Sequence, residues 1–385
     1  MTVTNLGLRV VLAAVLVLGC TTSPAAPTGQ PTPSTSRPSA SLPTTPPAAT
    51  PTIHPTAAPS TRATPNATDN PTSNLPRVGT TLETGRFPVT LAADGVLLAQ
   101  KGEPVVIQRT DAHALSDMGD VDLGSTGGFP PDAQTIVAGN GGGVWVPLAA
   151  QRAVAKIEPV SGDVTRRLDV DAAAYSLIEH EGDLWIVDLE SDEVVRFNLK
   201  DERELARIKV VHPVGIAYDE GFMWVVQNAG RHEPSEPLSG PGGQLAKIDV
   251  ETNLVTKYVP VGHRPLFVAS GWGAIWTSNA TSGSVSRVDS VTDDVIDIPI
   301  GADGAFDIEV TIRGVFVVIG PQWGPPCDPR DSYFVRIDPE THAVSARIDS
   351  PCPSSLTSDG GYGLWISGED DQGVISSHVT GLEPI

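Results

Sequence analysis

Short alternations of apolar and polar residues, separated by turns rich in glycine and acids, recur from Val78 to the end of the chain. The segment GDLWIVDLESDEVVRFN, from Gly182, reads as two strands joined by an acidic turn, and related segments begin at Gly142 and Gly273. A period of two residues is typical of strands with one face buried, and no stretch of this region sustains a helical period of 3.6. The pattern therefore predicts an all-β domain.

Seven such units are marked by a large apolar residue two or three positions after a turn, and their spacing is about 40 residues with three longer intervals. Repeats of this length made only of strands and turns are typical of propeller blades. We therefore expect a seven-bladed β-propeller of four-stranded antiparallel blades over residues 78–385. The markers are Leu97, Trp145, Trp185, Trp224, Trp276, Phe316 and Trp365.

Each unit divides into four predicted strands. PVGIAYD, from Pro213, is typical of a narrow innermost strand, and the marker strand follows, with its tryptophan packed between neighbouring sheets. A third strand ends in a basic, an apolar and an acidic residue, as in AKID from Ala246. A tight turn such as DPETH, from Asp338, leads to the fourth strand, because the Asp side chain can accept backbone N–H bonds there.

The two ends of this region complement each other. After Trp365 only one further strand is apparent, so the last unit lacks its outer strand. The segment 79–88 has the fourth-strand pattern but precedes the first unit. We expect it to pair with the C-terminal sheet and to close the ring without an open edge.

The first twenty residues read as an export signal, since the apolar run ending at Leu18 is too short to span a bilayer. The stretch LVLGC resembles the lipobox of bacterial lipoproteins, which implies lipidation of Cys20, and a plain secretory signal is the alternative. We therefore expect an exported, extracytoplasmic protein, lipid-anchored to the outer face of the cell membrane.

Residues 21–77 contain 14 Pro and 21 Ser or Thr with a single acid, so this segment cannot assemble a core. We interpret it as a disordered tether that could hold a domain on the order of 100 Å from the membrane. The remaining residues hold 45 acids against 21 Lys or Arg. Such a field makes nucleic acid and anionic lipid headgroups poor partners, and contact with the membrane is expected through the lipid only.

The Gly-x-x-Trp-Val signature followed by Arg/Lys-apolar-Asp resembles the streptogramin (virginiamycin B) lyase and YVTN repeat group over most of residues 79–385. The resemblance implies a seven-bladed propeller. The lyases use His and Glu near a bound magnesium ion, and their blades repeat Trp-Phe-Thr-Glu. The fourth position of that repeat is acidic only once in this sequence, so no catalytic residue transfers: the residues there are Leu148, Asp188, Gln227, Asn279, Ile319 and Gly368.

Two long insertions are predicted between second and third strands, from Asn228 and from Gly320, on the face that commonly carries propeller sites. Cys327 lies in the second insertion, and Cys352 lies in the following loop of the same face. In an oxidising compartment we expect these two cysteines to form a disulfide.

Two histidines precede innermost strands in successive blades, at His212 and His263. With nearby acids they could hold a divalent cation such as Mg²⁺ or Ca²⁺, or act in acid–base chemistry, although solvated loop residues are the alternative. No cofactor is firmly predicted. The candidate binding residues on this face are Arg231, His232, Arg264, Trp323, Asp370 and Asp371.

Two classes of function stay open. The favoured one is a monomeric binding or scaffold module whose decorated face recognises a protein, a glycan or a small ligand. The other is a metal-assisted lyase or hydrolase centred on His212 and His263.

Overall fold

A computed structural model describes most of the chain beyond Val78. By its internal contacts the chain divides into Met1–Pro65 and Asn66–Ile385, and every described residue belongs to the second unit. Within these ranges no helix is long and apolar enough to cross a membrane. The described residues are 78–84, 89–92, 95–100, 105–111, 114, 116–124, 137–138, 142–228, 242–301, 304–320, 333–349, 353–358, 364–368 and 377–382.

The described strands form seven four-stranded antiparallel sheets, one for each sequence unit, and the prediction of an all-β propeller is confirmed. Six sheets take four consecutive strands, from β2–β5 to β22–β25, and the seventh has the order β1-β28-β27-β26. The strands are β1 Val78–Thr84, β2 Val89–Leu91, β3 Val96–Gln100, β4 Val106–Asp111, β5 Ser116–Asp122, β6 Val137–Ala138, β7 Val144–Leu148, β8 Ala153–Ile157, β9 Val164–Asp169, β10 Ala174–His180, β11 Asp183–Asp188, β12 Glu193–Asn198, β13 Arg203–Lys209, β14 Pro213–Asp219, β15 Phe222–Gln227, β16 Gln244–Asp249, β17 Leu254–Pro260, β18 Pro265–Gly271, β19 Ala274–Asn279, β20 Ser284–Asp289, β21 Val295–Pro299, β22 Ala305–Thr311, β23 Gly314–Ile319, β24 Tyr333–Asp338, β25 Ala343–Asp349, β26 Pro353–Ser358, β27 Leu364–Gly368 and β28 Ser377–Leu382.

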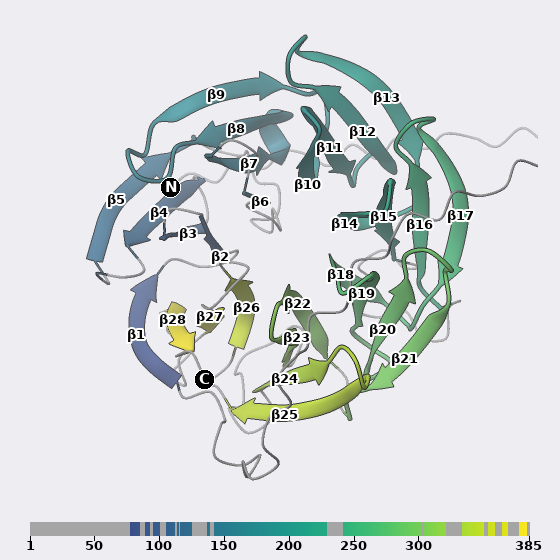
Figure 1. Ribbon diagram of the computed structural model, residues 1–385. Helices are drawn as coiled ribbons and strands as arrows, with labels where there is room; N and C mark the ends of the chain where they lie inside the picture. The colour runs from purple at the N-terminus through teal and green to yellow at the C-terminus, as the bar shows by residue number, and fades with distance from the viewer. Residues whose placement is uncertain are drawn as a thin grey trace, which may run out of the picture. The chain divides into compact units, whose positions relative to one another are not determined.

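The first strand of each of these six sheets lies innermost, as does β26 in the seventh, and successive innermost strands contact one another around a ring (Figure 1). The ring closes where β26 meets β2. The expected seam is also present, because β1 pairs antiparallel with β28, with Thr84 opposite Ser377. A strand that follows the predicted tether thus completes the C-terminal sheet, and this closure removes an open edge from the seam.

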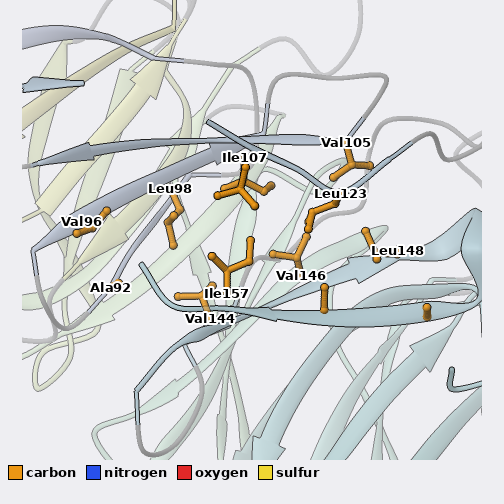
Figure 2. Close-up of a cluster of buried hydrophobic side chains, with 13 residues drawn as sticks. Ala92, Val96, Leu98, Val105, Ile107, Leu123, Val144, Val146, Leu148 and Ile157 are labelled. Carbon is orange, nitrogen blue, oxygen red and sulfur yellow. The ribbon is translucent and has the colours of Figure 1, made fainter. Parts of the chain in front are cut away.

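Four of the seven marker residues fill the space between neighbouring sheets, as predicted. Trp145, Trp185, Trp224 and Trp276 are fully buried, and each packs into a cluster with residues of the next sheet. Figure 2 shows the corresponding apolar cluster between sheets β2–β5 and β6–β9, in which Leu98 and Ile107 face residues of β7 and β8. Packing of each sheet against the next makes the core continuous around the ring.

The basic residue of the third strand has a structural role that explains its recurrence. Lys247 lies opposite Trp224 in the β15–β16 pair, with its ammonium 4.7 Å from the ring centroid. The same ammonium donates to Asp293 Oδ1 at 2.6 Å, in the β20–β21 turn of the next sheet. Arg196 repeats both contacts, over Trp185 at 4.8 Å and to Asn253 Oδ1 at 3.0 Å. Each basic side chain therefore fixes its own blade to the following one.

The acidic residue that ends the third strand caps the turn after it, also as predicted. Asp338 Oδ1 accepts backbone N–H bonds from Glu340 and Thr341, at 3.0 and 2.8 Å. Asp249 and Asp289 make the equivalent pairs of bonds. Backbone N–H donors, from the threonine of each turn first, hold the pKa of all three carboxyls below its ordinary value.

Candidate functional site

The two ends of the strands form different faces. The insertion face carries the connections from second to third strands and from one sheet to the next. Asn228 and Gly242, the described residues on either side of 229–241, lie at this face, and so do Gly320 and Tyr333, on either side of 321–332. In the sheet between them, β18–β21, the connection from the second to the third strand is only the short turn 280–283. Both long connections thus start and end on this one face, on either side of that sheet.

The last residue of the second strand carries a polar side chain in three successive sheets. These residues are Asp188, Gln227 and Asn279, and each stands opposite the first residue of its innermost strand. Each has one buried side-chain oxygen, Oδ2, Oε1 and Oδ1 respectively, with no hydrogen-bond partner among the contacts of the described chain. Three neighbouring blades therefore present an unused acceptor at the same position of the insertion face.

Asp188 is the only carboxylate among the three and is fully buried. Its Oδ1 accepts a bond from the Ser191 backbone N–H at 3.1 Å, and its Oδ2 lies 3.9 Å from Arg207 Nη1. Arg207 is held more closely by Glu193 and Glu204, at 3.2 and 2.8 Å. Burial lowers the pKa of Arg207, but the bonds to Glu204 and Glu193 outweigh it and raise the pKa overall. The guanidinium thus stays charged near a carboxylate that it does not fully engage.

Asn279 sits in a buried hydroxyl cluster. Its Nδ2 donates to Ser284 Oγ at 3.1 Å and to Ser286 Oγ at 2.9 Å, and Ser286 Oγ accepts the Gly262 backbone N–H. A β-carbon at Gly262 would lie 2.4 Å from the Asn279 amide, so only glycine allows this approach. The amide is oriented by these contacts while its oxygen stays free to accept.

His212 lies one residue before Pro213 and His263 lies two residues before Pro265, so the two positions correspond only approximately, as the sequence already shows. His212 has φ 47° directly before β14, and its carbonyl accepts the Asn228 N–H at 3.1 Å. Arg264 has φ 54° directly before β18, and its carbonyl accepts the Ala280 N–H at 3.0 Å. Arg264 is therefore the equivalent of His212, and His263 lies one residue earlier, exposed to solvent.

The environments of these three side chains also differ. His212 is half-buried with its Nδ1 unpartnered within the described structure, whereas the His263 backbone N–H donates to Ser282 Oγ at 3.2 Å. Burial lowers the pKa of Arg264. No hydrogen bond or ring contact joins the two imidazoles, both of which are described. Whether the two histidines act together with the acids 370 and 371, which lie outside the described ranges, stays a prediction.

The other predicted residues lie outside the described ranges, as do the cysteines of the proposed disulfide and the proposed lipidation site. Among the residues that are described, no group of three or more His, Cys, Asp or Glu could hold a metal ion. The residues outside the description are Cys20, Arg231, His232, Trp323, Cys327, Cys352, Asp370 and Asp371.

In the sequence, Asp188, Gln227 and Asn279 stood out only because they occupy the fourth position of the Trp-Phe-Thr-Glu repeat of the lyases without being Glu. Their signal is a polar residue that ends an otherwise apolar second strand. Whether the side-chain oxygen finds a partner depends on contacts across the sheet, so the sequence could not identify these residues as a set.

Solved structures resemble this chain in fold. A streptogramin B lyase structure superposes with a TM-score of 0.59 at 15% identity, covering 79% of this chain and 94% of that one. The Myceliophteria thermophila Cps50 (Swd1) β-propeller domain gives 0.59 at 9% identity, covering 81% and 100%. A chain of a mitotic checkpoint complex gives 0.60 at 11% identity, covering 84% and 99%. At these identities the likeness shows the propeller fold alone.

No family model matches the chain. No curated protein matches it either.

Proposed function

We propose that this protein is an extracytoplasmic binding or scaffold module, anchored to the membrane by lipid, that takes its ligand on the insertion face. The observation that carries the proposal is the set of three unused acceptors at Asp188, Gln227 and Asn279 on the face from which both long connections leave. A β-propeller is consistent with such a module, because its rigid sheets can support variable loops at one end.

The chemistry of these atoms indicates the class of ligand. A buried acceptor left without a partner costs about 1–3 kcal/mol, and three in neighbouring blades are an appreciable loss for one domain. Because these oxygens are buried, a ligand with several O–H or N–H donors, such as an oligosaccharide or a peptide, would complete them through water or after local opening of this face. The Asp188 carboxylate further favours a neutral or cationic ligand over an anionic one.

A thermal-shift comparison tests this function. Oligosaccharides, short peptides and divalent cations are added to the full chain and to two variants: Asp188→Asn, and one with residues 229–241 replaced by Gly-Ser-Gly. A ligand of the insertion face should raise the melting temperature of the wild type and do so less in both variants. Glu251→Gln, in a turn at the opposite ends of the strands, is the matched control. A ligand that stabilises all four proteins equally would contradict the proposal.

The anchor is tested separately. Lipidation at Cys20 would place the protein in the membrane fraction, whereas Cys20→Ser would release it to the medium. Mass spectrometry of the N-terminal peptide should find acyl chains on Cys20. An unmodified peptide starting elsewhere would support the plain secretory signal instead.

The second candidate is a metal-assisted lyase or hydrolase, favoured by the likeness to the streptogramin B lyase fold. It requires His212 and His263 to act with residues outside the described ranges. If purified protein contains a divalent metal that His263→Ala and His212→Ala remove, this class gains. If both substitutions leave metal content and thermal stability unchanged, the metal-assisted class is contradicted.

A further inference from the structure

The opposite ends of the strands form the turn face, which carries the connections from first to second and from third to fourth strands. On this face four successive sheets, from β10–β13 to β22–β25, place their first turns side by side around the ring. His180 stacks on Tyr218 with ring centroids 3.7 Å apart and joins the first two turns. The Trp272 indole N–H donates to the Thr311 carbonyl at 2.9 Å and joins the last two.

The residues at the tips of these turns are acidic in the first two sheets and apolar in the last two. Glu181 and Glu220 stand first in the two-residue turns of the first two sheets, with φ of 48° and 49°, and both are exposed. Trp272 occupies the same position in the third sheet, with φ 56° and 45% of its surface exposed. Ile312, in the turn of the fourth sheet, is 56% exposed. Two acids are thus followed by two large apolar side chains.

The Trp272 side chain is not needed by its turn, in which Trp272 has φ 56°. The first position of a two-residue hairpin turn with positive φ favours Asn, Asp or Gly, and a bulky residue there is uncommon. The core does not use the Trp272 side chain, because the buried aromatic of this sheet is Trp276. The indole edge is nevertheless fixed by its bond to Thr311. The ring is therefore held in one orientation with much of its surface in solvent.

We propose that Glu181, Glu220, Trp272 and Ile312 form a docking surface for a protein segment that carries Lys or Arg beside an aliphatic side chain. Trp is the ring that best attracts a cation on its face, and it is over-represented among residues that dominate protein interfaces. Glu220 in the neighbouring turn and Glu181 in the turn beyond it supply negative charge on the same face, and the chain as a whole has a net charge of −21.

The same charge argues against the other occupants. An anionic membrane surface would be repelled by this field, and so would a second copy of this chain. A basic protein segment gains from the field on approach and from Trp272 and Ile312 on contact. This surface is distinct from the insertion face, so the protein would bind two partners at opposite ends of its strands.

Fluorescence anisotropy with a defined peptide tests the proposal. The probe is a fluorescein-labelled decapeptide of alternating Lys and Leu, titrated with the full chain. Trp272→Glu installs the residue type that the two equivalent turns already carry, so the fold should be kept, as circular dichroism and thermal melting can check. We expect this variant to bind the peptide at least tenfold more weakly.

The direction of the change in affinity distinguishes docking on Trp272 from general electrostatic attraction. Added negative charge would strengthen binding that is purely electrostatic, so unchanged or tighter binding by Trp272→Glu would overturn the proposal. Trp272→Phe, which keeps a ring, should retain most of the affinity. Val160→Glu, which changes an exposed apolar residue in the turn after β8, is the matched control and should not weaken binding. Equal losses in both Glu variants would also overturn it.

The other occupants are outcomes of the same set of variants. If Trp272→Glu abolishes binding to phosphatidylserine vesicles and leaves peptide binding intact, the surface is a membrane contact. If sedimentation shows a dimer that Trp272→Glu converts to a monomer, the surface joins two copies of the chain. Either result would overturn the assignment to a basic protein segment.

Discussion

The two faces of the propeller contrast in which positions carry polar groups without a partner. On the turn face the repeated residues satisfy one another: Lys247 and Arg196 reach the next blade, and Asp249 and Asp338 cap their turns. On the insertion face one repeated position, held by Asp188, Gln227 and Asn279, keeps an oxygen without a partner, whereas the unpartnered oxygens of Asp219 and Ser290 on the turn face are at unrelated positions. The repeated contacts of the turn face therefore join blade to blade, whereas the repeated position of the insertion face adds no such contact.

The largest effect should come from the aromatic residues that pack sheet against sheet. Trp224→Ala empties a fully buried site between sheets β14–β17 and β18–β21 and should lower the free energy of unfolding by about 3–5 kcal/mol. Denaturant unfolding of the full chain measures this loss. Trp272→Ala, at an exposed tip, should cost about 1 kcal/mol or less because only one hydrogen bond is lost. Comparable losses would contradict the packing role of Trp224.

The next effect concerns the basic residue that joins two blades. Lys247→Met removes the buried ammonium between the Trp224 ring and Asp293, and should destabilise the protein by about 2 kcal/mol. Lys257 binds the other oxygen of the same Asp293 at 3.0 Å, but its side chain is 52% exposed. Lys257→Met should therefore cost about 0.5 kcal/mol. Chemical denaturation measures the unfolding free energy of both variants. An equal loss would mean that the lost charge determines the effect and that burial of the Lys247 ammonium does not.

The capping carboxyls of the turn face should make stability depend on acid pH. Backbone N–H donors hold the pKa of Asp249, Asp289 and Asp338 below 3.8 in the folded state. A depressed pKa gives stability that is fully present above the unfolded value and is lost as pH falls through the folded value. The melting temperature should therefore drop below about pH 4. The triple Asp→Asn variant should show a shallower drop, and an identical profile would assign the acid sensitivity to other groups.

The smallest expected effect on stability comes from a residue of the insertion face, whose substitution should leave the free energy of unfolding unchanged or raise it. Gln227→Leu removes an acceptor without a partner, so the free energy of unfolding should stay within about 0.5 kcal/mol of the wild type or rise. Ligand binding at this face should weaken in the same variant. A loss above about 1 kcal/mol in denaturant unfolding would mean that the Gln227 oxygen is already satisfied, for example by bound water.

Particular residues show how far the sequence could go. The period of two, the repeated Trp and the acid after each third strand predicted the sheets, the packing and the turns, because these depend on contacts within a unit or between adjacent units. The pairing of residues after 78 with the last strand was also predictable, since a missing outer strand left one candidate. The sequence placed His212 one residue and His263 two residues before the proline of its innermost strand, and the structure adds that the Arg264 carbonyl accepts the first N–H after the second strand, as the His212 carbonyl does.

The sequence by itself determined the repeat, the strand pattern and the place where the ring closes, because burying alternate residues fixes strand faces and register. Only the tertiary structure decided which polar atoms have a hydrogen-bond partner. Residues at equivalent positions are indistinguishable along the chain until the neighbouring blades supply or withhold a partner. For that reason Asp188, Gln227, Asn279 and the exposed Trp272 emerged as candidates only in the folded ring.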